Sequence, residues 1–264
     1  MKIKKIDNIP KNLQNIKSPP KELYFQGNLE LLQKPIIAII GTRRPSQYSR
    51  NITYSLSNRL ADSGFVIVSG GAMGTDILAH KGAMPNTISV MANSLDIIYP
   101  KINTNTIKEM AEKSLLISEY SENITAHSKR FIHRNRLIIG LADIVIIIEA
   151  DSKSGSSQSM RIAKEMKKDI FVLPHRIGES TETNRYLENG DAQAIFNVDT
   201  FLVNMKTLFG IEKQVSNKKA DSILEFCKSS PTYEETFNKF GNKLFEYELD
   251  GKIEILNGCV VITS

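Results

Sequence analysis

The sequence predicts an α/β fold, with a mostly parallel sheet that carries helices on both faces and a small domain after it. Three observations support this prediction. Short apolar runs alternate with helical segments from residue 35 onward, each run has the length of a strand, and the alternation ends near residue 212. Strands that alternate with helices are typical of parallel sheets, because a crossover between parallel strands needs a long connection.

Six apolar segments carry the strand signal. The first, Ile36–Ile40, is continuously apolar, which is typical of a strand buried on both faces. The others are Phe65–Val68, Thr87–Met91, Leu115–Ser118, Asp143–Ile148 and Ile170–Leu173. Six short strands separated by helices predict a Rossmann-like sheet.

Helices are predicted between these strands. The segment Tyr48–Ser63 ends before Gly64, a typical residue just after a helix. The other predicted helices are Thr75–Ala83, Asn105–Lys113, His133–Leu141 and Ser156–Lys167. Prolines break residues 1–34, which we interpret as a short N-terminal extension before a Rossmann-like domain at residues 35–212.

The rhythm changes after residue 212. Residues 213–220 are polar and charged and are interpreted as a linker. Short helices are predicted at Asp221–Lys228, Thr232–Phe240 and Asn242–Asp250. Strands at Lys252–Leu256 and Cys259–Thr263 flank Asn257-Gly258, which favours a type I′ hairpin. Three helices and a hairpin predict a winged-helix-like domain at residues 221–264.

The charge is concentrated in the larger domain. The chain carries a net charge of +5, whereas residues 215–264 hold six Lys/Arg and eight Asp/Glu, a net of −2. The remainder therefore carries +7, which fits a polyanionic partner. Neither Cys227 and Cys259 nor the four histidines have metal-ligand spacing, so we predict no metal and no cofactor. No apolar run approaches the roughly 20 residues of a membrane span, and a cytoplasmic location without membrane contact is expected.

The turn after the first strand holds two arginines. Ligands of an open parallel sheet bind outside the carboxyl ends of its strands. Arg43 and Arg44 follow Gly41 there, just before a predicted helix N-terminus, where N–H groups and guanidinium donors favour phosphate. The competing interpretation is a pair of solvated surface arginines.

The turn after the second strand is rich in glycine. It reads Ser69-Gly70-Gly71-Ala72-Met73-Gly74-Thr75-Asp76, which is neither a dinucleotide fingerprint nor a P-loop. Ser69, Gly70, Gly71 and Gly74 are candidate anion contacts, because a backbone without side chains can approach an anion closely. The alternative is that this turn serves only helix–strand packing.

Five potential cations surround one aromatic residue before the fifth strand. Lys129, Arg130 and Arg134 are candidate phosphate contacts, and Phe131 is a candidate platform for a base, a combination that suits single-stranded nucleic acid. The alternative places Phe131 in the core and the charges on the surface. Arg136 is interpreted as a structural helix residue, because arginines on either side of Asn135 point in different directions.

The acidic residues at this edge predict no catalytic centre. Asp76, Glu119, Glu149 and Asp151 are candidates, but their spacing identifies no carboxylate pair of the kind a hydrolase needs. Ser154-Gly155-Ser156 opens a helix and is assigned to capping. We therefore predict a protein that is not an enzyme.

Several motifs together resemble the DNA-processing protein A family, also called Smf. They are Leu23-Tyr24-x-x-Gly27, Gly41-Thr42-Arg43, Ser69-Gly70-Gly71-x-x-Gly74-x-Asp76 with His80, Tyr99-Pro100, Ser118-Glu119, Phe131 with Arg134-Asn135-Arg136, and Ser154-Gly155-Ser156. The resemblance implies a homodimer that binds and protects incoming single-stranded DNA during natural transformation and loads a RecA-type recombinase, without nucleotide hydrolysis. It carries the DNA pocket onto Arg43, Ser69–Gly71, Phe131 and the basic residues around it. One departure is Ser128, where relatives often have Lys.

The sequence leaves two other functions open. A nucleotide-processing hydrolase of the lysine-decarboxylase-like Rossmann family would carry a Pro-Gly-Gly-x-Gly-Thr motif and paired glutamates, which the stretch from Glu149 to Ser157 lacks. A protein-interaction scaffold leaves the basic edge unexplained. The C-terminal domain is predicted to serve protein contacts or modest DNA association, because Glu246, Glu248 and Asp250 on its third helix repel phosphate.

Overall fold

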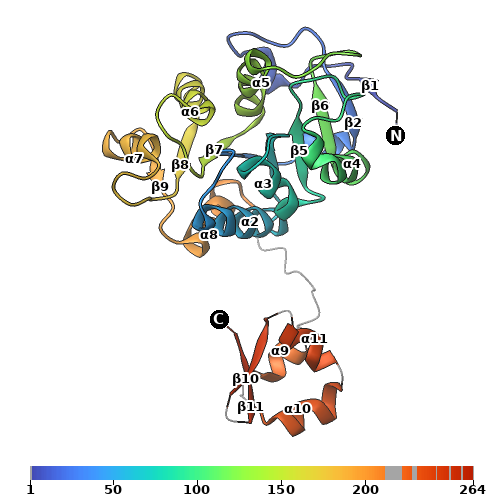
Figure 1. The fold of residues 1–264 in the computed structure, drawn as a ribbon, viewed down its shortest axis with the longest axis vertical. Coiled ribbons are helices and arrows are strands. Elements are labelled where there is room, and N and C mark those ends of the chain that lie inside the picture. Colours follow the sequence, from blue (N-terminus) through green and yellow to red (C-terminus); the bar gives the residue numbers. More distant parts are fainter. Residues whose placement is uncertain are drawn as a thin grey trace. The chain divides into compact units, whose positions relative to one another are not determined.

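The computed structural model describes residues 2–211, 222–227, 231–241, 243–249, 251–256 and 258–263. The chain divides into two compact units, residues 1–211 and 212–264 (Figure 1). The predicted linker at residues 213–220 lies outside the described residues, as does Asn257 of the predicted hairpin turn. Among the described residues, no helix has both the length and the apolar character that crossing a lipid bilayer requires.

The described part of the first unit forms a nine-stranded sheet in the order β1-β2-β6-β5-β4-β3-β7-β8-β9. Its strands are β1 Lys4–Lys5, β2 Tyr24–Gly27, β3 Ile36–Ile40, β4 Val66–Gly70, β5 Thr87–Val90, β6 Leu115–Ser118, β7 Ile144–Ile147, β8 Asp169–Val172 and β9 Gln193–Ala194. The pairs β1–β2 and β2–β6 are antiparallel, and every other pair in the sheet is parallel. The predicted mostly parallel sheet is confirmed.

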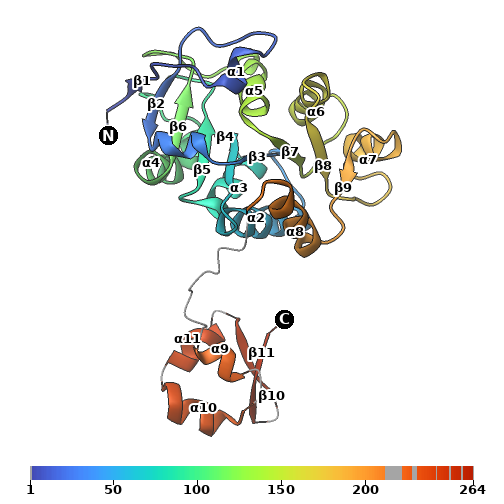
Figure 2. The ribbon, with the colours of Figure 1, turned by 180° about the vertical axis from the view of Figure 1, so that it is seen from behind.

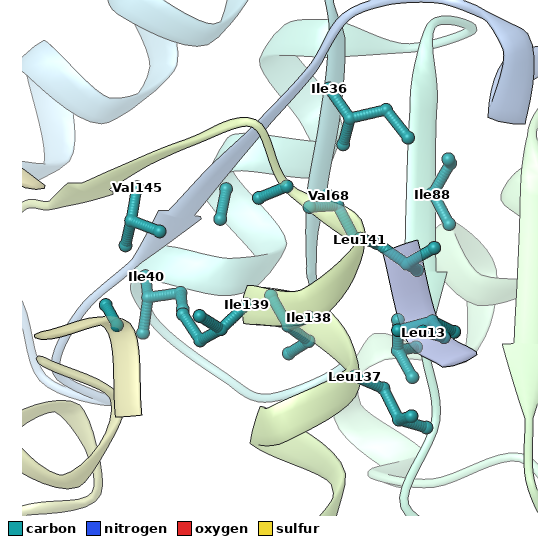
Figure 3. Close-up of a cluster of buried hydrophobic side chains, with 14 of the residues drawn as sticks. Leu13, Ile36, Ile40, Val68, Ile88, Leu137, Ile138, Ile139, Leu141 and Val145 are labelled. Atoms are coloured by element: carbon teal, nitrogen blue, oxygen red, sulfur yellow. The ribbon is translucent and has the colours of Figure 1, made fainter. Parts of the chain in front are cut away.

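Helices cover both faces of this sheet (Figures 1 and 2). They are α1 Lys11–Gln14, α2 Gln47–Asp62, α3 Thr75–Ala83, α4 Thr104–Lys113, α5 Ser128–Leu141, α6 Gly155–Glu165, α7 Thr181–Glu188 and α8 Val198–Leu208, with the 3-10 turns η1 Leu29–Gln33 and η2 Lys101–Asn103. Successive side chains of β3 point to opposite faces of the sheet, so they pack against two different layers of helices. Ile36 and Ile40 pack with α1, α5 and α6, as Figure 3 shows for α1 and α5, whereas Ile37 and Ile39 pack with α2, α3 and α8.

The strand order reverses beside β3. This strand pairs in parallel with β4 on one side and with β7 on the other. The helix after β3, α2, packs on one face of the sheet, and the helix after β7, α6, packs on the opposite face. The two connections therefore diverge at the carboxyl ends of β3 and β7 and leave a crevice, which is where open α/β sheets bind ligands.

Several predicted boundaries were wrong. Strand β4 runs to Gly70, so Ser69 and Gly70 end a strand instead of opening a loop. Helix α5 begins at Ser128, five residues before the predicted start at His133. Residues 1–34 do more than extend the chain, because β2 pairs with β6 and continues the sheet. Strand β9 and helices α7 and α8 were not predicted at all.

The second unit contains α9 Ser222–Cys227, α10 Tyr233–Phe240, α11 Lys243–Leu249 and the antiparallel pair β10 Ile253–Leu256 and β11 Cys259–Ile262. Thr232 and Glu235 form a capping box that begins α10. Ile223 of α9, Leu244 of α11 and Val260 of β11 form one small core, and Phe237 of α10 packs against it. Three helices followed by two strands is the element order predicted for this segment. Of its acidic residues, Asp250 and the side chain of Glu246 lie outside the described residues.

Candidate nucleic-acid interface

A cavity of about 410 Å³ lies at the crevice beside β3 and β7. Its walls come from the turns after β3 and β4, from α5 and from the start of α6. The lining residues are Ile40, Gly41, Thr42, Arg43, Ala72, Asp76, Ser128, Phe131, Ile132, Arg134, Asn135, Ile138, Ser154, Gly155 and Ser156. We call it the switch-point cavity.

A cation and two aromatic rings meet at the mouth of this cavity. The exposed Arg43 guanidinium lies over the half-buried ring of Phe131, with its carbon 5.2 Å from the ring centroid. Tyr99, which is 42% exposed, places its ring centroid 5.9 Å from that of Phe131 at a tilt of 41°. Arg43, Tyr99 and Phe131 also line a smaller hollow of about 40 Å³. A guanidinium can bind phosphate while an aromatic face stacks on a base.

Two glycines allow the turns after β3 and β4 to touch. A Cβ atom on Gly41 would lie 2.5 Å from the Thr75 hydroxyl, and one on Gly74 would lie 2.5 Å from the Arg43 carbonyl. Gly74 also has a φ of +80°, which residues with side chains rarely adopt. The Thr75 amide and hydroxyl both donate to the Thr42 carbonyl at 3.1 Å. This packing fixes the backbone that carries Arg43.

Arg134 lines the switch-point cavity although it is almost fully buried. It is 4% exposed and donates to the Val90 carbonyl, and its Nε donates to the Asn135 side chain at 3.2 Å. Burial lowers the pKa of Arg134 to about 10, which still leaves it charged at neutral pH. Burial also raises the pKa of Asp76, and the nearby Arg134 opposes that shift. Arg134 therefore balances a buried acid and braces the glycine-rich turn.

His80 holds the same turn from below. Its Nε2 lies 2.7 Å from the Gly70 carbonyl and its Nδ1 lies 2.7 Å from the Thr87 hydroxyl. Burial lowers the pKa of His80 to about 4, so the ring is neutral at neutral pH. Because a carbonyl oxygen only accepts, Nε2 donates to Gly70, and the Thr87 hydroxyl that faces Nδ1 donates to the Ile67 carbonyl at 2.8 Å.

Only three of the predicted contact residues line the switch-point cavity: Arg43, Phe131 and Arg134. Ser69 is fully buried and donates to the Ile39 carbonyl at 2.6 Å, so its hydroxyl cannot contact a DNA strand bound in the cavity. Gly70 and Gly71 are buried as well. Gly74 caps α3 behind Arg43. For these four residues the structure supports the packing alternative.

The other predicted cations point elsewhere. The Arg130 guanidinium lies 5.1 Å from the Tyr120 ring centroid and donates to the Thr125 carbonyl. Lys129 is exposed on α5 and is absent from the cavity wall. Arg44 is exposed and also lies off this wall. Because α5 already begins at Ser128, neighbouring residues there face different directions around the helix.

The structure adds residues that the sequence did not single out as contacts. Thr42 and Asn135 line the cavity, and Asn135 also donates to the Ser159 hydroxyl at 3.0 Å. Ser154 accepts from the Ser157 amide at 3.0 Å, so the predicted capping role is observed at the cavity wall. Tyr99 was visible only as part of a Tyr-Pro motif.

The candidate acids all have partners within the protein. Glu119 accepts from Arg136 at 2.5 Å, Glu149 accepts from the Ser46 amide at 3.0 Å, and Asp151 accepts from the Thr181 amide at 3.3 Å. Among the described residues, no three His, Cys, Asp or Glu side chains are grouped as a metal site would need.

Comparison with known proteins gives one consistent result. The family model described as DNA recombination-mediator protein A matches residues 2–206. Protein Smf from Synechocystis is 34% identical over 205 residues, which is 74% of this chain and 51% of that protein. DNA processing protein DprA from Streptococcus pneumoniae is 36% identical over 65% of this chain and 61% of its own length. The chain thus spans little more than half the length of these curated relatives.

Two solved structures share the fold. The first is DNA processing protein A from Helicobacter pylori, from a study of its unique single-stranded DNA binding mode. It superimposes with a TM-score of 0.77 at 47% identity, over 78% of this chain and 97% of its own. Its counterpart from Streptococcus pneumoniae gives a TM-score of 0.72 at 32% identity, over 76% of this chain and 74% of its own.

Proposed function

The chain belongs to the DNA recombination-mediator protein A family, and from this premise we propose that it binds single-stranded DNA in the switch-point cavity without catalysing a reaction. The observation that carries the proposal is the meeting of Arg43 and Phe131 at the cavity mouth. One side chain offers phosphate a charged donor, and the other offers a base a ring face. The Helicobacter pylori relative, known for its single-stranded DNA binding mode, supports this assignment.

The aromatic surface favours a single strand over a duplex. A base can stack on Phe131 only if it is free to leave its neighbours, as the bases of a single strand are. The bases of a duplex are already paired and stacked on one another, so a ring at the mouth of a cavity gains little from them. Arg43 adds a contact that depends on charge and not on base identity, so we propose binding with little sequence preference.

The buried part of the site supports this role indirectly. Arg134, Asp76 and His80 hold the glycine-rich turn, and Gly74 packs on the backbone of Arg43. A contact residue fixed in advance loses less conformational entropy on binding than a mobile one does. We propose that these residues orient Arg43 and do not themselves touch DNA.

The biological setting is proposed from the resemblance to the family. We propose that the protein protects incoming single-stranded DNA during natural transformation and loads a RecA-type recombinase, acting as a cytoplasmic homodimer. The resemblance in sequence and the family model that matches residues 2–206 support these partners. For the C-terminal unit we keep the prediction of protein contacts or modest DNA association.

The proposal of a non-catalytic protein has its own test. Asp76 is the acid on the cavity wall, and it is buried beside Arg134 instead of next to a second carboxylate. A hydrolase acting on nucleotides would need a general base or nucleophile free to reach its substrate. Incubation with nucleoside monophosphates should release no free base. Release of base that is lost in an Asp76→Asn variant would instead favour the hydrolase.

Fluorescence anisotropy with a labelled thymidine oligonucleotide of about 20 nucleotides tests DNA binding directly. A duplex of the same length serves as the comparison, at about 50 and 200 mM salt. We expect tighter binding to the single strand and a steep loss of affinity with salt. Arg43→Ala should weaken binding by about tenfold or more, as the loss of a charge-assisted contact predicts. Arg50→Ala on α2 is the matched control, because Arg50 is exposed and lines neither the switch-point cavity nor the smaller hollow at its mouth. Equal affinity of the wild type and Arg43→Ala would reject the proposal.

A further inference from the structure

A second cavity, of about 540 Å³, lies on the other flank of α5. It is lined by Ser18, Pro19, Lys21 and Glu22 of the N-terminal segment, by Glu119 and Tyr120 after β6, and by His133 and Arg136 of α5. Phe131 and Asn135 of the same helix line the switch-point cavity. At 100° per residue, His133 and Arg136 point away from Phe131 and Asn135, so α5 separates the two cavities.

Arg136 is the unusual residue of this second cavity. Arg136 is 9% exposed, and its Nη2 donates to the Glu119 carboxylate at 2.5 Å and lies 3.0 Å from His133 Nε2. Its Nε and Nη1 atoms are buried without a hydrogen-bond partner. Buried donors in native proteins nearly always have an acceptor, so this site calls for one that the chain does not supply.

The charges around the cavity favour an anionic acceptor. Each carboxylate on its wall already has a cation: Glu119 pairs with Arg136, and Glu22 pairs with Lys5 at 2.6 Å. Lys21 is exposed on the same wall, and no ion pair joins it to another described residue. Arg130 adds a further cation above Tyr120. An acceptor with negative charge in this cavity would lie beside two cationic side chains, the Lys21 ammonium and the Arg136 guanidinium.

A row of side chains leads from one cavity toward the other. Lys129, His133 and Arg136 stand four and three residues apart on one face of α5, and Lys129 lies in the first turn of the helix, beside Ser128 of the switch-point cavity. A strand held at Phe131 can therefore pass the N-terminal end of α5 along this face. Each nucleotide along such a path presents a phosphate.

We propose that the second cavity binds a phosphate of the same DNA strand, several nucleotides from the base at Phe131. The proposal rests on the function proposed above and gives it a second contact. It also assigns Lys129, which lies off the switch-point cavity, to the path between the two sites. Arg136 receives a ligand role in addition to its structural pairing with Glu119.

Oligonucleotide length separates the two sites experimentally. A strand of about four nucleotides can occupy the switch-point cavity alone, whereas one of about 20 nucleotides can reach both. Lys21→Glu should weaken binding of the long strand by about tenfold and make its affinity less dependent on salt, by about 0.7 in the log–log slope for one phosphate contact. It should leave the affinity for the short strand within about twofold. Lys108→Glu on α4 makes the same charge change at an exposed site outside both cavities and should change neither affinity.

A second variant tests the buried donors. Arg136→Lys keeps a cation opposite Glu119 but removes the guanidinium donors, and it too should weaken only the long strand. If Lys21→Glu binds the long strand as the wild type does, the proposal is overturned. It is also overturned if Lys21→Glu weakens binding of the short strand as much as binding of the long one. A third contrary result would be that inorganic phosphate perturbs the NMR signals of His133 while the long strand binds Lys21→Glu normally. Arg43→Ala should weaken both lengths; its failure to do so would reject the function proposed above and not this inference alone.

Discussion

The turns after β3 and β4 leave neighbouring parallel strands, yet they differ in exposure and in role. The β3 turn presents Arg43 to solvent above Phe131. The β4 segment has more glycine and looks more like a phosphate loop, but Ser69, Gly70 and Gly71 are buried. The two turns touch where Gly74 packs on the Arg43 backbone. We therefore interpret the glycine-rich turn at this edge as a support and propose the arginine turn as the contact surface.

This difference predicts two separable kinds of defect. Substitutions in or beneath the β4 turn should lower the free energy of unfolding, because they disturb buried packing and hydrogen bonds. Substitutions at the mouth of the switch-point cavity should lower DNA affinity and leave folding nearly unchanged. A residue of the β4 turn whose loss abolished binding without affecting stability would break the comparison.

The largest expected effect is that of Gly74→Ala. The methyl group would meet the Arg43 carbonyl carbon and oxygen, and the residue would have to keep a φ of +80°. Backbone strain and overpacking of about 1–3 kcal/mol each predict a loss of about 3–4 kcal/mol in the free energy of unfolding. Urea denaturation measures this loss. Gly155→Ala is the matched control, since a Cβ there meets nothing within 4 Å, and it should be nearly neutral.

Acidification should destabilise the first unit through His80. Its pKa is lowered to about 4 in the folded protein, against an ordinary value of 6.5. The unfolded chain therefore takes up a proton below about pH 6.5 that the folded chain refuses, and stability falls as the pH drops from there toward 4. Between about pH 7.5 and 5 the loss amounts to about 2 kcal/mol.

A His80→Gln variant isolates this contribution. It removes the titrating ring, so its free energy of unfolding should lose that part of the pH dependence, although its stability at neutral pH is lower. The raised pKa of Asp76 acts in the opposite direction, because the folded chain holds that proton to higher pH than the unfolded chain does. Wild-type and His80→Gln curves of the same slope would show that burial of His80 does not hold it neutral.

Phe131→Leu tests the exposed side of the comparison. Leucine keeps an apolar side chain against Arg43 and Tyr99 but removes the ring face. Loss of base stacking should cost about 1–2 kcal/mol of binding free energy for single-stranded DNA. Thermal melting should change little, because the ring is only half-buried. A variant that melts much earlier yet binds normally would place Phe131 in the core, as the alternative interpretation held.

Tyr99→Leu should give the smallest effect. Its ring stands 5.9 Å from that of Phe131 and is tilted by 41°, so it is a neighbour of the stacking surface and not its centre. We expect a loss of about 0.5–1 kcal/mol in affinity, typical of one aromatic pair. Competition between labelled and unlabelled oligonucleotide resolves a change of this size. A loss larger than that of Phe131→Leu would make Tyr99 the main platform.

Much of the fold could be predicted because its strands are short apolar runs. Ile36–Ile40 and Leu115–Ser118 were predicted to the residue. Strand β1, with only two residues, carries no such pattern, and β2 joins the sheet by pairing with β6, which lies about 90 residues further along the chain. The strand propensity of a short segment does not predict which distant strand it pairs with.

The site could be predicted only in part, because the phase of a helix decides which face a charge occupies. Ser128-Lys129-Arg130 has no apolar periodicity, so the start of α5 was placed too late and Arg130 was grouped with Phe131. Burial of Arg134 also escaped prediction, since arginine is rarely buried unless it is paired. Its partners, Val90 and Asp76, come from distant parts of the sequence.

A crystal structure of the protein with a bound thymidine oligonucleotide tests the central claim most directly. We predict a phosphate within hydrogen-bond distance of the Arg43 guanidinium, a base against the ring of Phe131, and no contact from the DNA to Ser69, Gly70 or Gly71. A strand that bound elsewhere, or one that lay in a nest of the glycine-rich turn with Arg43 turned away, would contradict the division between contact and support.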